Sequence, residues 1–477
     1  MQTRPSVKNA LDAIFPPRAI AIAGVSTNPG KHLSGREFLD ALVDAGYQGK
    51  IYPVNPAGGE VYGRKLYTSI RDIPDNVDYV MSAVPARHNL QLLRDAAAKG
   101  ARVVHIYSAG FSEIADPQGK KLEEELAAVA REVGIHVIGP NCMGVYSPKY
   151  GLSFRQGLPR TAGSLGFISQ SGSNSFLVIR DGSLRGVHMS KLFSYGNAAD
   201  LDECDILEYL AQDSETDIIG GYIEGVDDGR RFLQTLKKIT PQKPVVLYKA
   251  GNTGSGLRAV SSHTGTLAGS EKIWQAALRQ AGAVQVASME ELVDMVVLFH
   301  HMAPPRGTNT ALFGVGGGAI VQSTDECAEA GLNLPLLPAE TRRKLEELYT
   351  SETGGSFRNP IDVYLGKRDL IQGTVQMIAA LPEIDLIMMQ FLIGYGGRGE
   401  KTLVKTFLEA IVNLSKSISR RTAIVIRPSG ILRFSQYNLK TQQKLVAAGY
   451  PVFESAKRAA SAIVKYLDYH QRKARRK

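Results

Sequence analysis

The chain alternates between short apolar runs and longer amphipathic segments. Residues 19–23 are apolar throughout and stop at Gly24, which is typical of a strand buried on both faces of a parallel sheet. Residues 37–45 then carry apolar side chains at helical spacing and stop at Gly46. The same pattern predicts further strands at 51–54, 79–84, 103–107 and 136–138, with helices at 90–99 and 118–133. Strands that alternate with helices in this way predict a doubly wound parallel sheet.

The alternation occurs in three blocks. It lapses over 146–163 into a linker of Gly, Pro, Ser and Arg, and a second stretch rich in helix breakers follows at 302–307. The second block has predicted strands at 165–169, 189–193, 217–223 and 245–248, and the third has them near 310–313, 386–390 and 423–426. Because 477 residues exceed what one hydrophobic core serves, we predict three α/β domains, at residues 1–150, 160–302 and 307–470.

The composition is that of an ordinary globular protein, with 44% hydrophobic residues and 48 glycines. No apolar run approaches the roughly 18 residues that span a bilayer, and the N-terminus lacks the apolar core of a signal peptide. The 3 cysteines are odd in number and widely spaced, which argues against a disulfide framework. We therefore expect a cytoplasmic protein with buried or incidental thiols, no membrane partner and no metal site.

The formal net charge of +10 points towards anionic ligands. Its one dense basic cluster, at residues 472–477, is typical of a solvated tail, and no nucleic-acid-binding motif accompanies it. The remaining basic residues are spread along the chain. Small phosphorylated molecules are therefore favoured over nucleic acid as partners.

The turn after the first strand, residues 24–31, contains two glycines and leads towards a helix. Backbone N–H groups at such a helix start can hold a phosphate. A nicotinamide coenzyme is the obvious alternative, but the turn is not G-x-G-x-x-G, and the next strand ends Pro53-Val54-Asn55-Pro56 without an acidic residue for a ribose. A tight turn that binds nothing is the third possibility.

Two more turns follow strands of the same predicted sheet. They contain Val84-Pro85 and Gly139-Pro140-Asn141. Each is also explained as a turn that proline and glycine demand. Open α/β sheets bind ligands at the carboxyl ends of their strands, so the shared position of these turns favours one crevice that includes Gly24.

In the second block, residues 168–175 join an apolar strand to a predicted helix and are rich in serine. A helix that starts here would offer N–H groups, hydroxyls and the positive end of its dipole to an anion. Plain N-capping by serine is a common alternative.

Residues 261–270 place one imidazole, that of His263, in a small loop rich in hydroxyls and glycines. Imidazole is a nucleophile near neutral pH, and the surrounding donors can bind a charged oxyanion. Glu224 ends a predicted strand and could accept the N–H of a histidine, and Lys249 ends the next strand and could supply positive charge. The ordinary alternatives are a loop histidine held by its neighbours, a solvated carboxylate and a solvent-facing lysine.

Short motifs between residues 10 and 465 occur in the order and spacing of one family. They are Gly24-Val25-Ser26, Tyr52-Pro53-Val54-Asn55-Pro56, Ser108-Ala109-Gly110-Phe111-Ser112-Glu113, Gly139-Pro140-Asn141-Cys142-Met143-Gly144, Ser169-Gln170-Ser171-Gly172, Tyr195-Gly196-Asn197-Ala198-Ala199-Asp200, Tyr222-Ile223-Glu224-Gly225 and Ser262-His263-Thr264-Gly265. On these motifs the chain resembles the α subunit, or α-like half, of NDP-forming acyl-CoA synthetases, the acetate–CoA ligase (ADP-forming) group of the succinyl-CoA synthetase superfamily. The resemblance implies a Rossmann-like CoA-binding domain followed by two flavodoxin-like domains.

The resemblance also implies a reaction. Acyl-CoA and phosphate exchange to an acyl phosphate, the phosphoryl group moves to His263, which Glu224 steadies, and phosphohistidine transfers it to ADP, with every step reversible. The residues implied to bind coenzyme A are Gly24, Ser26, Lys31, Pro53, Asn55, Val84, Pro85, Gly139, Pro140 and Asn141. Those implied to bind phosphate are Ser169, Ser171, Gly172, Ser173, Thr264 and Gly265.

The sequence holds no region long enough for the ATP-grasp domain of related fused proteins. The resemblance therefore implies a separate ATP-grasp β subunit that supplies ATP or ADP with Mg²⁺ in a hetero-oligomer, with phosphate and a small carboxylic acid or acyl-CoA as the other partners. In the third block, Gly314-Val315-Gly316-Gly317-Gly318 stands where the family more usually has Thr-Asn-x-Gly-Gly. Asn359-Pro360-Ile361-Asp362, by contrast, fits the family pattern. Neither the acyl group nor the choice between ADP and GDP follows from the sequence.

Two other functions stay open. The first is a non-catalytic CoA-binding or regulatory protein that kept the fold, although the presence of both His263 and Glu224 favours chemistry. The second is an NAD-dependent oxidoreductase, which would need a nicotinamide coenzyme at the Gly24 turn.

Overall fold

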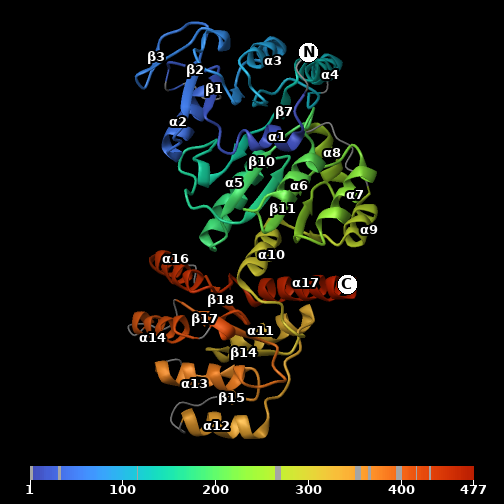
Figure 1. Ribbon diagram of the computed structural model, residues 1–477. Helices are drawn as coiled ribbons and strands as arrows, with labels where there is room; N and C mark the ends of the chain where they lie inside the picture. The colour runs from blue at the N-terminus through green and yellow to red at the C-terminus, as the bar shows by residue number, and fades with distance from the viewer. Residues whose placement is uncertain are drawn as a thin grey trace. The chain divides into compact units, whose positions relative to one another are not determined.

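The computed structural model of the chain describes residues 4–28, 30, 34–114, 116–263, 270–349, 356–363, 367–393, 400–414, 416–428 and 431–476. The chain divides into two compact units (Figure 1). Unit 1 comprises Met1–Arg180 and His188–Met289, and unit 2 comprises Asp181–Val187 and Glu290–Lys477.

The first sheet of unit 1 is parallel throughout, with strand order β2-β1-β5-β6-β7. Its strands are β1 (Ala19–Ala23), β2 (Lys50–Val54), β5 (Tyr79–Ser82), β6 (Val103–Ile106) and β7 (His136–Ile138). The order reverses between β1 and β5, and this is where a doubly wound sheet opens a ligand crevice. The other elements of this part are α1 (Val7–Asp12), α2 (Gly35–Ala45), α3 (Asn89–Ala98), α4 (Pro117–Val133), the hairpin β3 (Glu60–Val61) and β4 (Arg64–Lys65), and the short 3-10 helices η1 (Ile70–Asp72), η2 (Ala86–His88) and η3 (Pro148–Tyr150).

The hydrophobic pattern and the end residues account for these elements. All five residues of β1 are buried, as expected for a central parallel strand. Helix α2 begins where the Ser34 hydroxyl accepts the N–H of Arg36 at 3.3 Å, and it ends at Gly46, which takes the left-handed conformation. The predicted doubly wound parallel sheet is confirmed.

The second sheet of unit 1 has strand order β13-β12-β11-β9-β10-β8, in which only β8 runs antiparallel to its neighbour. Its strands are β8 (Gly144–Tyr146), β9 (Leu165–Ser169), β10 (Met189–Ser194), β11 (Ile218–Ile223), β12 (Val245–Lys249) and β13 (Val284–Val286). Its helices are α5 (Gly172–Leu184), α6 (Glu203–Gln212), α7 (Gly229–Ile239), α8 (Gly254–His263) and α9 (Glu271–Ala281).

Two local expectations in this region are wrong. The predicted linker of residues 146–163 starts inside β8, which pairs with β10 and so forms an edge of the second sheet. Ser261, Ser262 and His263 belong to α8 rather than to a loop. Leu257, Ala259 and their neighbours are compatible with a helix, and this helix continues further than the glycines and hydroxyls around it indicate.

Unit 2 contains a third sheet, with strand order β15-β16-β14-β17-β18-β19 and β15 antiparallel. Its strands are β14 (Thr310–Gly314), β15 (Ser356–Phe357), β16 (Ile361–Asp362), β17 (Leu386–Leu392), β18 (Thr422–Arg427) and β19 (Val452–Phe453). Its helices are α11 (Gly317–Ala330), α12 (Ala339–Tyr349), α13 (Arg368–Ala379), α14 (Glu400–Val412), α15 (Lys416–Ser419), α16 (Leu432–Ala447) and α17 (Ala456–Arg475), and α10 (Met289–His301) leads into the unit.

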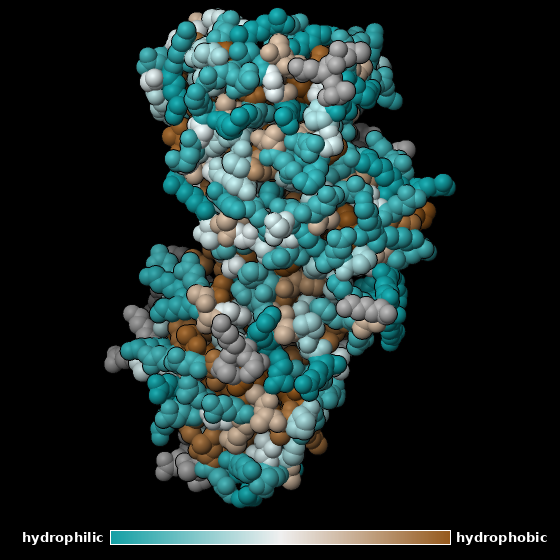
Figure 2. All heavy atoms as spheres, viewed as in Figure 1, coloured by the Kyte–Doolittle hydropathy of each residue, from teal (hydrophilic) through white to brown (hydrophobic). Residues whose placement is uncertain are grey.

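Hydrophilic residues cover much of the face shown in Figure 2. Among the described residues, no helix is both long enough and apolar enough to cross a membrane. Cys142, Cys204 and Cys327 are buried free thiols.

Candidate functional site

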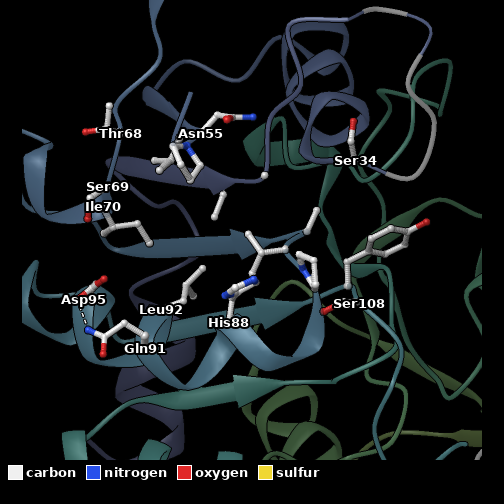
Figure 3. A pocket seen from close by; sticks show the side chains of 18 of the residues that line it. Ser34, Asn55, Thr68, Ser69, Ile70, His88, Gln91, Leu92, Asp95 and Ser108 are labelled. Atoms are coloured by element: carbon white, nitrogen blue, oxygen red, sulfur yellow. Dashed lines mark hydrogen bonds between the residues drawn. The ribbon is translucent and has the colours of Figure 1, made fainter. Parts of the chain in front are cut away.

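A cavity of about 840 Å³ lies at the carboxyl edge of the first sheet. Figure 3 shows side chains from several loops and from α3 around it. Five residues predicted from the turns line the cavity: Gly24, Asn55, Val84, Pro85 and Asn141. The reversal of strand order between β1 and β5 brings these turns together, as expected for an open α/β sheet.

The Gly24 turn is closely packed against the turn after β5. Gly24 has a φ of +87°, and a Cβ atom there would lie 2.7 Å from the carbonyl oxygen of Ala83. The Asn55 side chain ties the neighbouring turns together, because its amide donates to the Val25 carbonyl at 2.7 Å and its oxygen accepts the Ala57 N–H at 2.9 Å. Backbone therefore forms the wall of the cavity at this point, and a side chain at Gly24 would disrupt it.

Among the residues that the structure describes, four predicted coenzyme residues do not line this cavity: Ser26, Pro53, Gly139 and Pro140. The Ser26 hydroxyl accepts the N–H of Asn28 at 3.1 Å within its own turn. Pro53 lies within β2, in register with Ile22. Gly139 and Pro140 are joined by a cis peptide bond. Lys31 lies outside the described residues.

The cavity also has lining residues that sequence reasoning missed. They come from the segment before η1, from η2 and from α3, and include Thr68, Ser69, His88, Gln91 and Asp95. Gln91 donates to Asp95 at 2.8 Å along one turn of α3 (Figure 3). These residues follow no strand end and carry no motif, so the sequence offered no signal for them.

A second group of predicted residues surrounds the start of α5. The Ser169 hydroxyl accepts the N–H of Ser171 at 3.1 Å and donates to the Ser171 carbonyl at 2.7 Å. The Ser171 hydroxyl accepts the N–H of Asn174 at 3.4 Å and lies 3.1 Å from the Ser173 hydroxyl. Ser171 thus acts as an N-cap, which was the ordinary alternative for this serine. Gly172 is the first residue of α5, and a Cβ there would lie 2.5 Å from Cγ of Met143.

Glu224 follows β11 and is only 2% exposed. The Tyr222 hydroxyl donates to its Oε1 atom at 3.1 Å. Gln170, in the turn before α5, accepts the backbone N–H groups of Glu224 and Gly225, the latter at 3.2 Å. The turn before α5 is therefore held to the backbone at Glu224, and the buried side chain of Glu224 is not the solvated carboxylate that was its ordinary alternative.

His263 is the last residue of α8, the helix that follows β12. Its side chain, Thr264 and Gly265 lie outside the described residues. Helix α8 starts four residues beyond Ala250, which itself follows β12, the immediate neighbour of β11 in the sheet.

Lys249, the last residue of β12, differs from the expectation of a solvent-facing lysine. It is 2% exposed, and its Nζ donates to the Ala250 carbonyl and lies 5.4 Å from the centre of the Trp274 ring. Burial lowers the pKa of Lys249 to about 8, while the charge of Glu224 acts in the opposite direction. The burial arises because α9 brings Trp274 over the end of the strand, which the local sequence does not reveal.

Among the described residues, an acidic cluster lies at the start of α6. The ligand atoms of Asp202, Glu203 and Cys204 lie within 4.8 Å of one another. Asp202 is already engaged, because it caps α6 by accepting the N–H groups of Cys204 and Asp205 and forms an ion pair with Arg231. These contacts give the cluster a structural role at the start of α6.

In unit 2, the glycine run after β14 leads into α11. The N–H of Gly316 donates to Asp362 at 3.2 Å, so the run that departs from the family pattern is held by the motif that fits it. The Asn359 amide donates to the carbonyls of Thr310 and Pro335, both at 2.9 Å, and its oxygen accepts the N–H of Leu312.

Two families of known domains match the chain in this order. The family described as CoA binding domain matches residues 18–148, and the family described as succinyl-CoA ligase like flavodoxin domain matches residues 162–299. The first match covers the parallel sheet with the cavity, and the second covers the turn before α5, Glu224 and His263.

Relatives match over nearly the whole length. The chain is 35% identical to the α subunit of acetate–CoA ligase (ADP-forming) I of Pyrococcus furiosus, over 96% of this chain and 98% of that protein. It is 37% identical to the α subunit of the second such ligase of that organism, over 79% and 81%. The solved structure of the dinucleotide-forming acetyl-coenzyme A synthetase 1 of Ca. Korarchaeum cryptofilum, in complex with phosphate and ADP, matches with a TM-score of 0.81, 28% identity and 97% coverage of both chains.

A CoA-binding sheet followed by a succinyl-CoA ligase-like flavodoxin domain defines the acid–thiol ligase class. The chain belongs to the family of ADP-forming acyl-CoA ligases and is of the α-subunit type. The resemblance inferred from short motifs is thereby confirmed, as is the α/β architecture.

Proposed function

We propose that the chain interconverts acyl-CoA, ADP and phosphate with a carboxylic acid, CoA and ATP, by way of an acyl phosphate and a phosphohistidine at His263. The observation that carries this proposal is the pairing of the serine-rich start of α5 with the buried Glu224 through Gln170. It brings a site suited to a phosphoryl group next to a carboxylate suited to orient an imidazole.

We assign coenzyme A to the cavity of the first sheet. A volume of about 840 Å³ is in the range of small-molecule sites, and the cavity combines backbone at Gly24 with polar side chains such as Asn55. Coenzyme A would supply the thiol that leaves or re-forms the thioester. The proposed domain limits, residues 1–150, 160–302 and 307–470, place this cavity in the first domain.

The start of α5 would hold the phosphate and then the acyl phosphate. The first N–H groups of a helix lack intrahelical acceptors, and the dipole favours negative charge. A phosphate oxygen forms a bond to the thioester carbon as the carbon–sulfur bond breaks and the thiolate leaves. A nitrogen of His263 then forms a bond to phosphorus as the phosphorus–oxygen bond to the acyl group breaks and a carboxylate leaves. Glu224 accepts the other N–H of the imidazole in this scheme.

A separate ATP-grasp β subunit would complete the cycle. It would bring ADP and Mg²⁺ to the phosphohistidine in a hetero-oligomer, and the naming of relatives as α subunits supports this partner. A small carboxylic acid is the proposed substrate class, because two relatives act on acetate and one on 4-hydroxybutyrate according to their names.

Labelling tests the proposal. Wild-type chain incubated with acetyl-CoA and labelled phosphate is expected to gain an acid-labile, base-stable label, which His263→Ala loses and Glu224→Gln forms at least tenfold more slowly. His300→Asn, on α10, is the matched histidine control and should retain the label. Absence of label with a panel of acyl-CoA thioesters, even with the ATP-grasp subunit present, would overturn the proposal.

The same experiment separates the alternatives. A chain that binds coenzyme A in a calorimeter and never gains label would be a non-catalytic CoA-binding protein. Displacement of coenzyme A by NAD from the cavity would instead support the oxidoreductase.

A further inference from the structure

The buried hydroxyl of Tyr222 lies between two parts of the proposed phosphoryl-transfer site. Tyr222 is 9% exposed and is the last but one residue of β11. Its hydroxyl donates to Oε1 of Glu224 at 3.1 Å. The side chain of Asn174, in the first turn of α5, forms a hydrogen bond with the same hydroxyl. One phenol therefore connects the start of α5 to the carboxylate.

The direction of these hydrogen bonds follows from the groups. A carboxylate only accepts, so the Tyr222 proton lies towards Glu224, and the phenol oxygen accepts from the Asn174 amide. Burial and the nearby Glu224 charge raise the pKa of Tyr222, which keeps the hydroxyl protonated at neutral pH. A charged acceptor strengthens a hydrogen bond relative to a neutral one.

The backbone of Glu224 is held separately. Gln170 accepts the N–H groups of Glu224 and Gly225, so the chain after β11 cannot shift without breaking contacts to the turn before α5. Backbone is thus held by Gln170 and the carboxylate by Tyr222. The ring of Tyr222 is itself braced by Tyr248 of β12, with ring centres 5.6 Å apart.

We propose that Tyr222 is a positioning residue for phosphoryl transfer, which holds the Glu224 carboxylate in the orientation that the imidazole of His263 requires and connects it through Asn174 to the start of α5. This inference rests on the proposed function. It adds that an anion at the start of α5 and the orientation of Glu224 depend on each other through one phenol.

The test is a double-mutant cycle on the rate of phosphohistidine formation. Tyr222→Phe removes only the hydroxyl and is expected to lower the maximal labelling rate roughly 10- to 100-fold, with the half-saturating concentrations of acetyl-CoA and phosphate changed less than threefold. Because Tyr222 acts through Glu224, the same substitution in a Glu224→Gln background should change the rate less than threefold further. Tyr248→Phe, which removes a hydroxyl from the neighbouring ring, should label at the wild-type rate.

Three results would overturn the inference. They are an unchanged labelling rate in Tyr222→Phe, an equal loss of rate in the wild-type and Glu224→Gln backgrounds, and an unchanged maximal rate with only the half-saturating concentrations raised. Coenzyme A titration of each variant shows whether unit 1 is folded, and Asn174→Ala offers a second variant expected to slow labelling in the same way. If wild type itself gains no label, the proposed function fails, and that result is read from the wild-type sample alone.

Discussion

The side-chain amide of Asn197 donates to Oε2 of Glu113 at 2.6 Å and so ties the segment after β10 to the loop after β6. The same amide donates to Glu123 of α4 at 2.8 Å. Its oxygen accepts the amide of Asn141, which lines the cavity, at 3.3 Å. The Asn197 side chain is therefore one of the contacts that join the two sheets of unit 1, at the edge where coenzyme A is proposed to bind.

Substitution of this asparagine by a carboxylate should destabilise unit 1. Asn197→Asp replaces two amide donors by oxygen next to Glu113 and Glu123, which costs about 1–3 kcal/mol of unfolding free energy. Urea unfolding at pH 7 measures it. Addition of Glu123→Gln restores a donor opposite the new carboxylate and should recover about half of the loss. A double variant as unstable as the single one would contradict the role of this contact.

Alanine substitutions at two glycines with positive φ should distinguish the effect of backbone strain from that of a steric clash in the cavity wall. Gly24→Ala places a methyl group 2.7 Å from the Ala83 oxygen in the cavity wall, whereas Gly46→Ala, at a φ of +76°, meets nothing within 4 Å. Both lose roughly 1–2 kcal/mol to the left-handed conformation. Only Gly24→Ala should also weaken binding of coenzyme A, at least tenfold by calorimetry. Equal affinities in the two variants would remove Gly24 from the proposed site.

Acid should destabilise the protein through one buried and two half-buried histidines. Burial lowers the pKa values of His105, His301 and His470 to about 4. Unfolded histidine titrates near 6.5, so between pH 6.5 and 4 the unfolded chain binds more protons and the free energy of unfolding falls as the pH falls. Urea midpoints at pH 7, 5.5 and 4.5 measure this. His105→Gln keeps a donor for the Cys142 carbonyl, and it should reduce the change of the urea midpoint with pH that unit 1 contributes.

Glu203 should change the free energy of unfolding with pH in the direction opposite to that of the histidines. Burial, and next the charge of Asp202, raise the pKa of Glu203 to about 8. Between pH 4.5 and 8 the folded chain therefore binds more protons, and this group makes the free energy of unfolding fall as the pH rises. Glu203→Gln should stabilise the protein by about 1–3 kcal/mol at pH 8 and have little effect at pH 4. Glu208→Gln, on the same helix and more exposed, is the control and should show no such pH dependence.

Much of the architecture was predictable, because it depends on local patterns. The turns at Gly24, Val84-Pro85 and Asn141 lie at the carboxyl edge of the first sheet, as the alternation of strands and helices predicts. The roles of His263 and Glu224 came from family motifs and stay proposals. Thr68 and Asp95 were missed because no motif marks residues that reach the cavity from outside the strand ends.

The sequence alone determined the order of most strands and helices, the edge of the first sheet at which the cavity lies, and the family. Only the tertiary structure decided which polar groups are buried and what they contact: Lys249 beneath Trp274, Tyr222 on Glu224, and Asn197 between two carboxylates. Hydrophobic periodicity is a property of residues that are close in the sequence, so it can be read from a single chain. Burial and side-chain hydrogen bonding arise where crossover connections bring distant segments together, and local sequence patterns do not show which segments come into contact.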